Sequence, residues 1–326
     1  MMRRCQWLSL VAACLLGLPG LSAAHAQAYP DKPVTIIADS APGASPDVAV
    51  RIVADALGKI WKQQVVVVNH PGANGSIAAR AAAEAANDGY TLFGPVSSSF
   101  MALPTVAPNL PLKLPRDFVP IGFIAEQPMF VGVSPSLGVK NLSELIALAK
   151  QKPGTLSIAL TGFGRFTHLT GELLQERTGI RLLSVPYNHG PAAAVSDVAS
   201  GRVSMIIEGY SGIVGAVKAG QVKLIAAASR ERLPQFPNVP AVAETVPDFA
   251  ASGWIILTAP VGTPEPIIAK AGADLTKVVN DPAIKQKLAA IGSYTRPMTA
   301  PQVLAFVAEE QATWLPIVDK ISKQAK

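Results

Sequence analysis

The stretch "VTIIADSAPGASPDVAVR" (residues 34–51) places an apolar segment, a loop of small residues and a helix start in direct succession. The apolar run at 34–37 is typical of a buried strand. Ser45, Pro46 and Asp47 favour the beginning of a helix, with Ser45 as its N-cap. The loop before them is either a tight, well-capped turn or a site where backbone N–H groups at a helix start bind an anion.

The same succession of strand and helix recurs along the rest of the chain. We expect further strands at 65–68, 90–96, 129–133, 156–160, 181–187, 203–207, 222–229 and 254–260. We expect helices at 47–62, 76–86, 142–150, 167–178, 264–279, 282–291 and 301–320, with others between the later strands. Repeated strand–helix units indicate parallel sheets with helices on both faces, which is the α/β class.

Two sets of such units predict two lobes. The chain returns at its end to helices that the first sheet needs on its face, so we expect two crossings, near 127–130 and 250–254. This divides the chain into lobe 1, residues 27–128 and 252–326, and lobe 2, residues 129–251. Each lobe is expected to hold a mainly parallel sheet flanked by helices. Two facing lobes form a cleft that can close on a small molecule.

The N-terminus has the pattern of a secretory signal peptide. Arg3 and Arg4 precede an apolar run at 7–21, and an A-x-A cleavage pattern ends at Ala26. The run is too short to span a bilayer, which disfavours an anchoring helix. We therefore expect residues 1–26 to be removed.

Composition excludes several other classes of protein. The 326 residues are 49% apolar and 15% charged, which is typical of a globular chain. Cys5 and Cys14 are the only cysteines, and both lie in the expected signal peptide, so the mature chain has no disulfide or thiolate. The net charge is +6, but no basic run occurs, and we expect no nucleic-acid partner.

A second loop resembles the first. The stretch "ALTGFGRFTHLTGELL" (159–174) again runs from strand through glycines into a helix. Gly162 and Gly164 expose backbone, Thr161 offers a hydroxyl, and Arg165 offers a planar fork that suits a carboxylate. Arg165 could equally be a solvated loop charge. Two such helix starts, one in each lobe, are a more specific signal for ligand binding than either one alone.

Catalytic and metal-binding patterns are absent from the sequence. His70, His168 and His189 share no ligand spacing with one another or with carboxylates, so we expect no metal. There is no G-x-S-x-G or phosphate-binding G-x-x-x-x-G-K-[ST] motif. No nucleophile and base can be paired, and His168 is more readily a structural side chain than a base. We expect neither an enzyme nor a cofactor.

Several segments together resemble one family. "YPDKPVTII", "APGASPDVAVRIVADAL", "VVVVNHPGANGSIAARAAAEAANDGYTL", "NLSELIALAKQKPGTLSIALTGFGRFTHLTGELL" and "APVGTPEPIIAKAGADL" are similar to the periplasmic receptors of tripartite tricarboxylate transporters, the Bug receptors. The resemblance covers residues 29–320. It implies a two-lobe periplasmic binding protein fold, called a Venus flytrap, without catalysis. It also implies delivery of a small organic acid to inner-membrane permease subunits, and we expect a monomer.

The resemblance carries ligand-binding roles onto four loops. In that family the ligand carboxylate is held by backbone N–H groups, hydroxyls and bridging waters. The matching positions here are Ala41, Pro42, Gly43, Ala44, Asp47, Ser97, Ser98, Ser99, Thr161, Gly162, Gly164, His168, Glu208 and Gly209. Asp39, Ser40 and Arg165 complete the predicted site as departures from the family pattern.

The departures suggest a hypothesis about the ligand. The family loop usually begins Val-Pro-aromatic, where this chain has Ala38, Asp39 and Ser40. It usually has a second glycine, where this chain has Ala44. An alanine there costs backbone freedom if the position needs φ > 0. Arg165 would grip a carboxylate while Asp39 or Glu208 reads a donor, which suits an amino acid, hydroxy acid or nitrogen heterocycle. Alternatively, Asp39 and Arg165 neutralise one another across the closed cleft, or face solvent.

A second function stays open at this point. The closed, liganded form could dock on the periplasmic domain of a sensor instead of a permease. The same cleft serves both functions, and only the outer surfaces of the lobes would differ.

Overall fold

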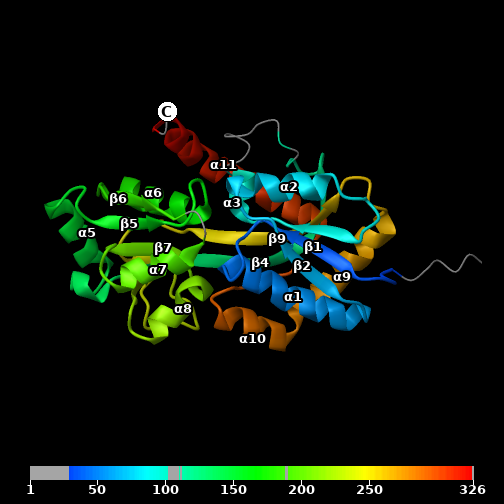
Figure 1. Ribbon diagram of the computed structural model, residues 1–326, viewed down its shortest axis with the longest axis horizontal. Coiled ribbons are helices and arrows are strands. Elements are labelled where there is room, and N and C mark those ends of the chain that lie inside the picture. Colours follow the sequence, from blue (N-terminus) through cyan, green and yellow to red (C-terminus); the bar gives the residue numbers. More distant parts are fainter. Residues whose placement is uncertain (1–28, 102–109, 111, 188–189, 325–326) are drawn as a thin grey trace, which may run out of the picture.

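The computed structural model describes residues 29–101, 110, 112–187 and 190–324. The expected signal peptide lies outside the described residues, as do both cysteines and His189. The described chain forms two lobes that lie side by side along the long axis of the molecule (Figure 1). Lobe 1 surrounds the first strands and the C-terminal helices, and lobe 2 surrounds the middle of the chain.

Lobe 1 begins with the predicted strand–loop–helix unit. Its strands are β1 (Val34–Ala38), β2 (Val65–Asn69), β3 (Thr91–Gly94), the first part of β4 (Phe118–Val133) and β9 (Ser252–Pro260). Its helices are α1 (Ser45–Trp61), α2 (Ser76–Ala83), α3 (Ser97–Met101), α9 (Glu265–Asn280), α10 (Pro282–Ala290) and α11 (Ala300–Gln324). β1 pairs in parallel with β2 and β3.

Lobe 2 repeats this plan. Its strands are the second part of β4, β5 (Ser157–Leu160), β6 (Leu183–Pro186), β7 (Met205–Gly209) and β8 (Lys223–Ala227). Its helices are α5 (Leu142–Gln151), α6 (Phe166–Thr178), α7 (Pro191–Ala199) and α8 (Tyr210–Lys218). β5 pairs in parallel with β6 and β7. The N-cap of α5 is Asn141, whose side chain accepts a hydrogen bond from the N–H of Glu144.

The two long strands β4 and β9 join the lobes and depart from the parallel pattern. β4 runs antiparallel to β7, β8 and β9, and β9 runs antiparallel to β3. β4 carries the chain into lobe 2 and β9 carries it back, so the two must run in opposite directions. β4 pairs with β9 as far as Pro128↔Ser252, and with β7 from Met129↔Gly209 onward. We propose that this change of partners marks the boundary between the lobes. Residues 27–128 and 252–326 then form lobe 1, and residues 129–251 form lobe 2.

The apolar pattern of the sequence predicts only the last part of β4, residues 129–133, as a strand. Pro120, Gly122 and Pro128 interrupt the apolar pattern of its first part. The register of the β4–β9 pair shifts between Pro120 and Gly122, and again between Phe123 and Ala125. Proline cannot donate to the ladder and is tolerated at such bulges. The strand therefore continues through residues that locally disfavour it.

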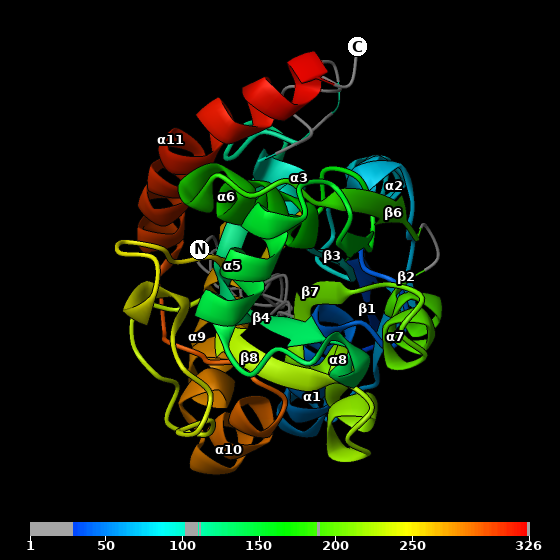
Figure 2. The same ribbon diagram turned by 90° about the vertical axis from the view of Figure 1, so that its left-hand side faces the viewer.

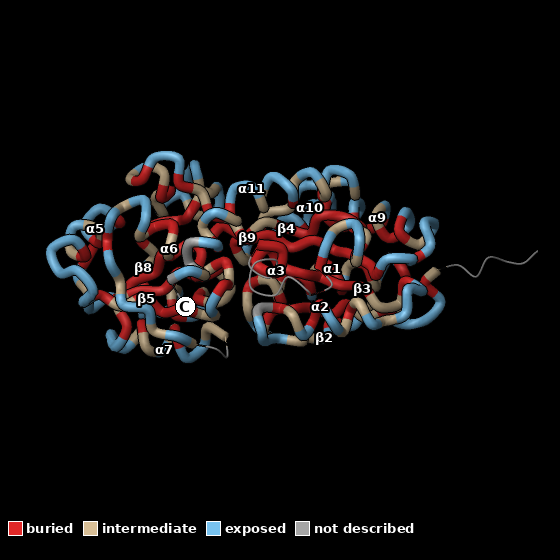
Figure 3. The backbone as a smooth tube through the Cα atoms, turned by 90° about the horizontal axis from the view of Figure 1, so that it is seen from above, coloured by how far each residue is buried: buried red, intermediate tan, exposed pale blue. Residues whose placement is uncertain are grey.

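Each lobe has a core on both faces of its sheet. In lobe 2, Met205 and Ile207 of β7 belong to the hydrophobic cluster with α5 and α6, and Ile206 to the cluster with α7 and α8. Figure 2 shows these helix pairs on opposite sides of the lobe 2 sheet. In lobe 1, α1, α9 and α10 cover one face, and α2, α3 and α11 the other. Burial is continuous along β4 and β9 (Figure 3).

Candidate functional site

A cavity of about 660 Å³ lies between the lobes. It is lined by loops that follow β1, β2, β3, β5 and β6, by the end of β7, and by residues of β4 and β9. Ligands of open α/β sheets bind at the carboxyl ends of parallel strands, where such loops meet. Of the predicted site residues, those lining the cavity are Ser40, Ala41, Pro42, Ala44, Ser97, Ser98, Thr161, Gly162, Arg165, Glu208 and Gly209. The predicted residues that do not line it are Asp39, Gly43, Asp47, Ser99, Gly164 and His168.

Asp39 is fully buried behind the lobe 1 wall. Its Oδ2 accepts hydrogen bonds from the N–H of Val96, at 3.3 Å, and from the hydroxyl of Ser99. Its Oδ1 is buried without a partner among the described residues. Burial raises the pKa of Asp39, against the charge of Arg165 and the hydrogen bonds from Ser99 and Val96. Its carboxyl group is bonded to Val96 and Ser99 and does not line the cavity, so this arrangement does not favour the hypothesis that Asp39 reads a ligand donor.

Arg165 reaches from lobe 2 across to lobe 1. Its Nη2 donates to the backbone carbonyl oxygen of Asp39 at 2.6 Å, and the side chain also lines the cavity. The two residues therefore meet, but through a carbonyl and not as a carboxylate–guanidinium pair. Gly162 permits this path, since an added Cβ there would lie 2.7 Å from Cγ of Arg165. Its φ of +122° also favours glycine.

The lobe 2 glycine loop is held in place by His168. The N–H of Gly164 donates to Nδ1 of His168 at 3.0 Å. In the neutral ring the proton is then on Nε2, which lies 3.6 Å from Oε1 of Glu172. His168 thus holds the loop through this hydrogen bond, and neither His168 nor Gly164 lines the cavity. Their predicted ligand contact stays a prediction, while the hydrogen bond between them gives both a structural role in the loop.

The lobe 1 loop is held in the same way by Asp47. Its carboxylate accepts from the N–H of Gly43 at 2.9 Å, from Asn69 at 2.8 Å and from Arg51. Burial raises the pKa of Asp47, but the hydrogen bonds from Arg51, Asn69 and Gly43 outweigh it and the pKa lies below its ordinary value. Gly43 has φ of +77°, so the positive φ of this turn falls on a glycine. Asp47 and Gly43 shape the loop without lining the cavity.

The start of α1 differs in detail from the prediction. Ala44, not Ser45, is the N-cap, and its φ is −67°. This position needs no positive φ, so an alanine is tolerated there. The hydroxyl oxygen of Ser45 is turned to lobe 2, where it accepts from the hydroxyl of Ser211 at 2.7 Å and the N–H of Gly212 at 3.3 Å.

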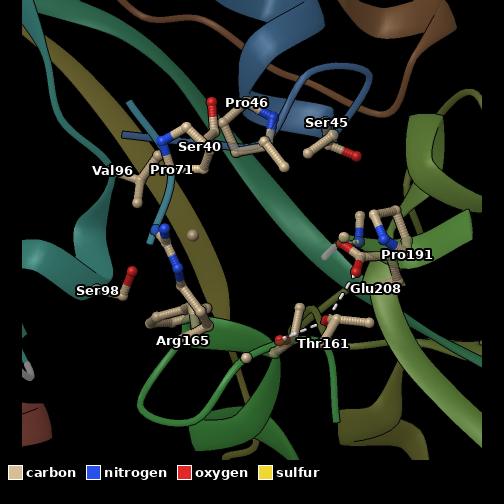
Figure 4. Close-up of a pocket in the computed structure, with 18 of the residues that line it drawn as sticks. Ser40, Ser45, Pro46, Pro71, Val96, Ser98, Thr161, Arg165, Pro191 and Glu208 are labelled. Carbon is tan, nitrogen blue, oxygen red and sulfur yellow. Dashed lines mark hydrogen bonds between the residues drawn. The ribbon is translucent and has the colours of Figure 1, made fainter. Parts of the chain in front are cut away.

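These contacts hold the lobes together on both sides of the cavity. Figure 4 shows Arg165 and Ser45 at opposite sides of it. Gly209 lies so close to Ser45 that an added Cβ would be 2.7 Å from the Cβ of Ser45. The structure is therefore a closed arrangement of the two lobes, with the cavity between them.

Two hydroxyl groups in the lobe 1 wall lack protein partners. Ser40 and Ser98 are buried and line the cavity, and the Oγ of each has no hydrogen-bond partner among the described residues. A buried hydroxyl without a partner costs free energy, about 1–3 kcal/mol. A polar ligand in the cavity would supply such partners.

The cavity also gathers the positive ends of helices. The N-cap residues of α1, α6, α7 and α8 all line it, namely Ala44, Arg165, Gly190 and Gly209. A helix N-terminus carries a partial positive charge and N–H groups that favour anions. Arg165 is the basic side chain and Glu208 the acidic side chain among the described residues that line the cavity.

Glu208 belongs to the lobe 2 wall and is 7% exposed. Its Oε1 accepts from the N–H of Gly209 and its Oε2 from the hydroxyl of Thr161, both at 2.9 Å. Burial raises its pKa, and these two hydrogen bonds and the charge of Arg165 oppose the rise. The Thr161 oxygen also lies 3.0 Å from that of Thr167, which fixes the threonine in the wall.

Several lining residues were not predicted. Met129, Phe166 and Trp254 give the cavity an apolar surface, and Pro71, Gly72 and Pro191 lie at loops on either side. In the sequence, Met129, Phe166 and Trp254 have the apolar pattern of core residues, and that pattern does not distinguish the floor of a cavity from a hydrophobic core. The loop at 71–72 follows β2, so the rule that ligands bind after parallel strands could have indicated it.

The described residues hold no group of three or more His, Cys, Asp or Glu side chains arranged for a metal ion. Within the same part of the chain, no helix has the length and apolar character needed to cross a membrane.

A sequence model of the family described as "Tripartite tricarboxylate transporter family receptor" matches residues 49–323. The chain belongs to this family. The receptor is 33% identical over 319 residues to protein BugT of Bordetella pertussis, covering 97% of this chain and 98% of BugT. The family is one of periplasmic binding receptors and not of enzymes.

Two solved structures with bound carboxylates are similar to the receptor. The R. palustris protein Rpa4515 with adipate has a TM-score of 0.85 at 27% identity, covering 90% of this chain and 98% of that one. MatC (Rpa3494) from Rhodopseudomonas palustris with bound malate has a TM-score of 0.80 at 28% identity, covering 89% and 100%. These similarities confirm the two-lobe α/β fold predicted from the sequence.

Proposed function

We propose that the mature receptor captures a small organic carboxylate in the cavity between its lobes. The observation that carries this proposal is Arg165, the basic side chain that lines the cavity, on a wall where helix N-termini converge. The partnerless hydroxyls of Ser40 and Ser98 add hydrogen-bond donors for the carboxylate oxygens. Each of these groups favours an anion, and none requires a reaction.

The adipate and malate in the similar structures support the same class of ligand. We propose direct contact for the lining residues alone. Six predicted residues do not line the cavity and act by fixing the shape of the loops, namely Asp39, Gly43, Asp47, Ser99, Gly164 and His168.

We further propose that the receptor acts in the periplasm as a monomer and delivers its ligand to inner-membrane permease subunits. Closure brings the lobe surfaces around Arg165 and Ser45 into contact, as the bonds to Asp39 and Ser211 show. A permease that binds the closed arrangement would therefore distinguish the loaded receptor from an open one. Export depends on the signal peptide expected at 1–26.

A thermal-shift screen of the chain from Gln27 tests the proposed ligand class. The panel contains dicarboxylates, tricarboxylates, amino acids, hydroxy acids and aromatic acids, with sugars and amines as controls. A ligand that binds only the folded state raises the Tm according to how far its concentration exceeds its Kd. We expect Tm to rise with one group of acids. A rise with only sugars or amines, or with no compound, would contradict the proposal.

A further inference from the structure

The cavity carries opposite charges on different sides. Figure 4 shows the guanidinium group of Arg165 and the carboxyl group of Glu208 at separate places on its wall, with Thr161 beside Glu208. Met129, Phe166 and Trp254 also line the cavity and provide apolar surface. Such a cavity is complementary to a molecule with charged ends of opposite sign and an apolar middle.

Glu208 is held as a hydrogen-bond acceptor. Both of its protein partners donate to it, Gly209 through a backbone N–H and Thr161 through its hydroxyl. A carboxylate has about four lone-pair sites, so two remain for other donors. The N–H of Gly209 stands at the beginning of α8, where the helix dipole favours a negative charge.

Glu208 also lacks a direct counterion in the protein. No basic side chain of the described residues forms an ion pair with it, and only the more distant charge of Arg165 acts on it. A buried charge is costly unless it is paired, and its pairing partner must then come from the cavity. A ligand ammonium group provides both the opposite charge and N–H donors.

We propose that the receptor selects amino-carboxylates, with Arg165 holding the carboxylate and Glu208 acting as the specificity-determining residue for the ammonium group. This inference rests on the proposed function and names the substrate class of the same cavity. Asp39 takes no part in it, because its carboxyl group is bonded to Val96 and Ser99 and does not line the cavity.

A dicarboxylate would meet Glu208 differently. Its second carboxylate would lie against the Glu208 carboxyl group, and the two could share the site only if one of them took up a proton. Binding would then be coupled to proton uptake, whereas an ammonium group binds the ionised Glu208 without it. Among the described residues, the charge of Arg165 acts on Glu208 and opposes the rise of its pKa. Proton uptake therefore separates the two classes of ligand.

The test is calorimetric titration with ligands matched in length. The probes are adipate, 6-aminohexanoate and hexanoate, together with the shorter series glutarate, 5-aminopentanoate and pentanoate. We expect the amino acid of one series to bind at least about 10-fold more tightly than the dicarboxylate of that series, as a charged hydrogen bond provides. Titration in buffers of different ionisation enthalpy should show no proton uptake with the amino acid.

A variant pair sharpens the result. Glu208→Gln keeps the shape and removes the charge, and should weaken the amino acid about 10-fold to 100-fold while leaving the dicarboxylate unchanged or tighter. Glu231→Gln, an exposed lobe 2 residue outside the cavity, is the matched control and should change neither affinity. The ratio of the affinities of the unmodified receptor for the amino acid and for the dicarboxylate is decisive even where Glu208→Gln fails to fold.

Three outcomes would overturn the inference. A dicarboxylate preference with proton uptake would assign Glu208 a protonated, donor role. An unchanged ligand ratio in a folded Glu208→Gln variant would remove Glu208 from specificity. Both outcomes leave the proposed carboxylate receptor intact. If none of these acids binds and the wider acid panel also fails, the proposed function and the inference fall together.

Discussion

The two walls of the cavity keep their charged residues in different places. In lobe 1, Asp39 and Asp47 stand behind the wall and are bonded to the loops that they support. In lobe 2, Arg165 and Glu208 face the cavity. Lobe 1 therefore offers hydroxyls and backbone, while lobe 2 offers charge.

This difference separates two uses of a buried charge. A carboxylate that accepts several protein N–H groups, as Asp47 does, fixes a loop and needs no ligand. A carboxylate or guanidinium that lines a cavity is left with capacity for an outside partner. We infer that lobe 1 sets the shape of the site and lobe 2 sets the charge of its ligand.

The largest expected effect is on the lobe 2 cation. Arg165→Ala removes the carboxylate partner and the hydrogen bond to the Asp39 carbonyl, and should weaken carboxylate binding about 100-fold or more in calorimetry. The affinity of Arg165→Lys should lie between those of the unmodified receptor and Arg165→Ala, since lysine keeps the charge but lacks the planar fork.

Arg181→Ala, at an exposed position of lobe 2 outside the cavity, is the control and should bind as the unmodified receptor does. Equal affinity in Arg165→Ala and Arg181→Ala would break the comparison, because lobe 2 would then not supply the charge.

The next effect concerns the lobe 1 hydroxyls. Ser40→Ala or Ser98→Ala should stabilise the ligand-free receptor by about 1 kcal/mol, because each removes a buried hydroxyl without a protein partner. Each should also weaken ligand binding about 10-fold. Urea unfolding and calorimetry measure the two changes.

Ser99→Ala is the contrasting neighbour. Its hydroxyl donates to Asp39 behind the wall, so its loss should destabilise the receptor by about 1–3 kcal/mol. Destabilisation by Ser98→Ala and stabilisation by Ser99→Ala would reverse the assignment of the two serines.

A smaller effect is the pH dependence contributed by Asp39. Its pKa is raised in the folded receptor, so the folded state holds this proton more tightly than the unfolded chain. The resulting stability is fully present below about pH 4 and is lost as the pH rises through the folded pKa. Asp39→Asn has no carboxyl group to titrate and so does not lose this stability. Its free energy of unfolding, relative to that of the unmodified receptor, should therefore increase as the pH rises from about 4 through the folded pKa of Asp39.

Thermal unfolding of both proteins between pH 3 and pH 8, on the order of the range in which carboxyl groups titrate, measures that difference. A constant difference across this range would show that Asp39 has an ordinary pKa in the folded receptor.

The smallest expected effect is on closure. Ser45→Ala removes the contacts to Ser211 and Gly212 without removing a charge, and should weaken ligand binding only about 3-fold. Small-angle X-ray scattering should show a larger radius of gyration in the ligand-free variant. An unchanged radius and affinity would mean that the Ser45 contacts do not contribute to closure.

The fold could be predicted from the sequence where local pattern and tertiary structure agree. The apolar runs of β1 and β5, followed by glycine or small-residue loops and helices, predicted the two halves of the cavity. The first part of β4 could not be predicted, because Pro120 and Pro128 contradict a strand locally and only pairing with β9 maintains it.

The site was predictable as a set of loops but not as a set of contacts. Residue type and position marked Asp39 and His168 as site candidates and Ser45 as a helix N-cap, yet the partner of each side chain decides its role. Asp39 turns to Ser99, His168 to Gly164, and Ser45 to Ser211. Each partner is distant in sequence or set by loop shape, which no local pattern encodes.

The most direct test of this account is a crystal structure of the mature receptor grown with the acid that binds most tightly. We predict that its carboxylate oxygens lie within hydrogen-bond distance of the Arg165 guanidinium group and of the Ser40 or Ser98 hydroxyl. An acid bound outside the cavity, or one whose carboxylate contacts neither Arg165 nor these serines, would contradict the account.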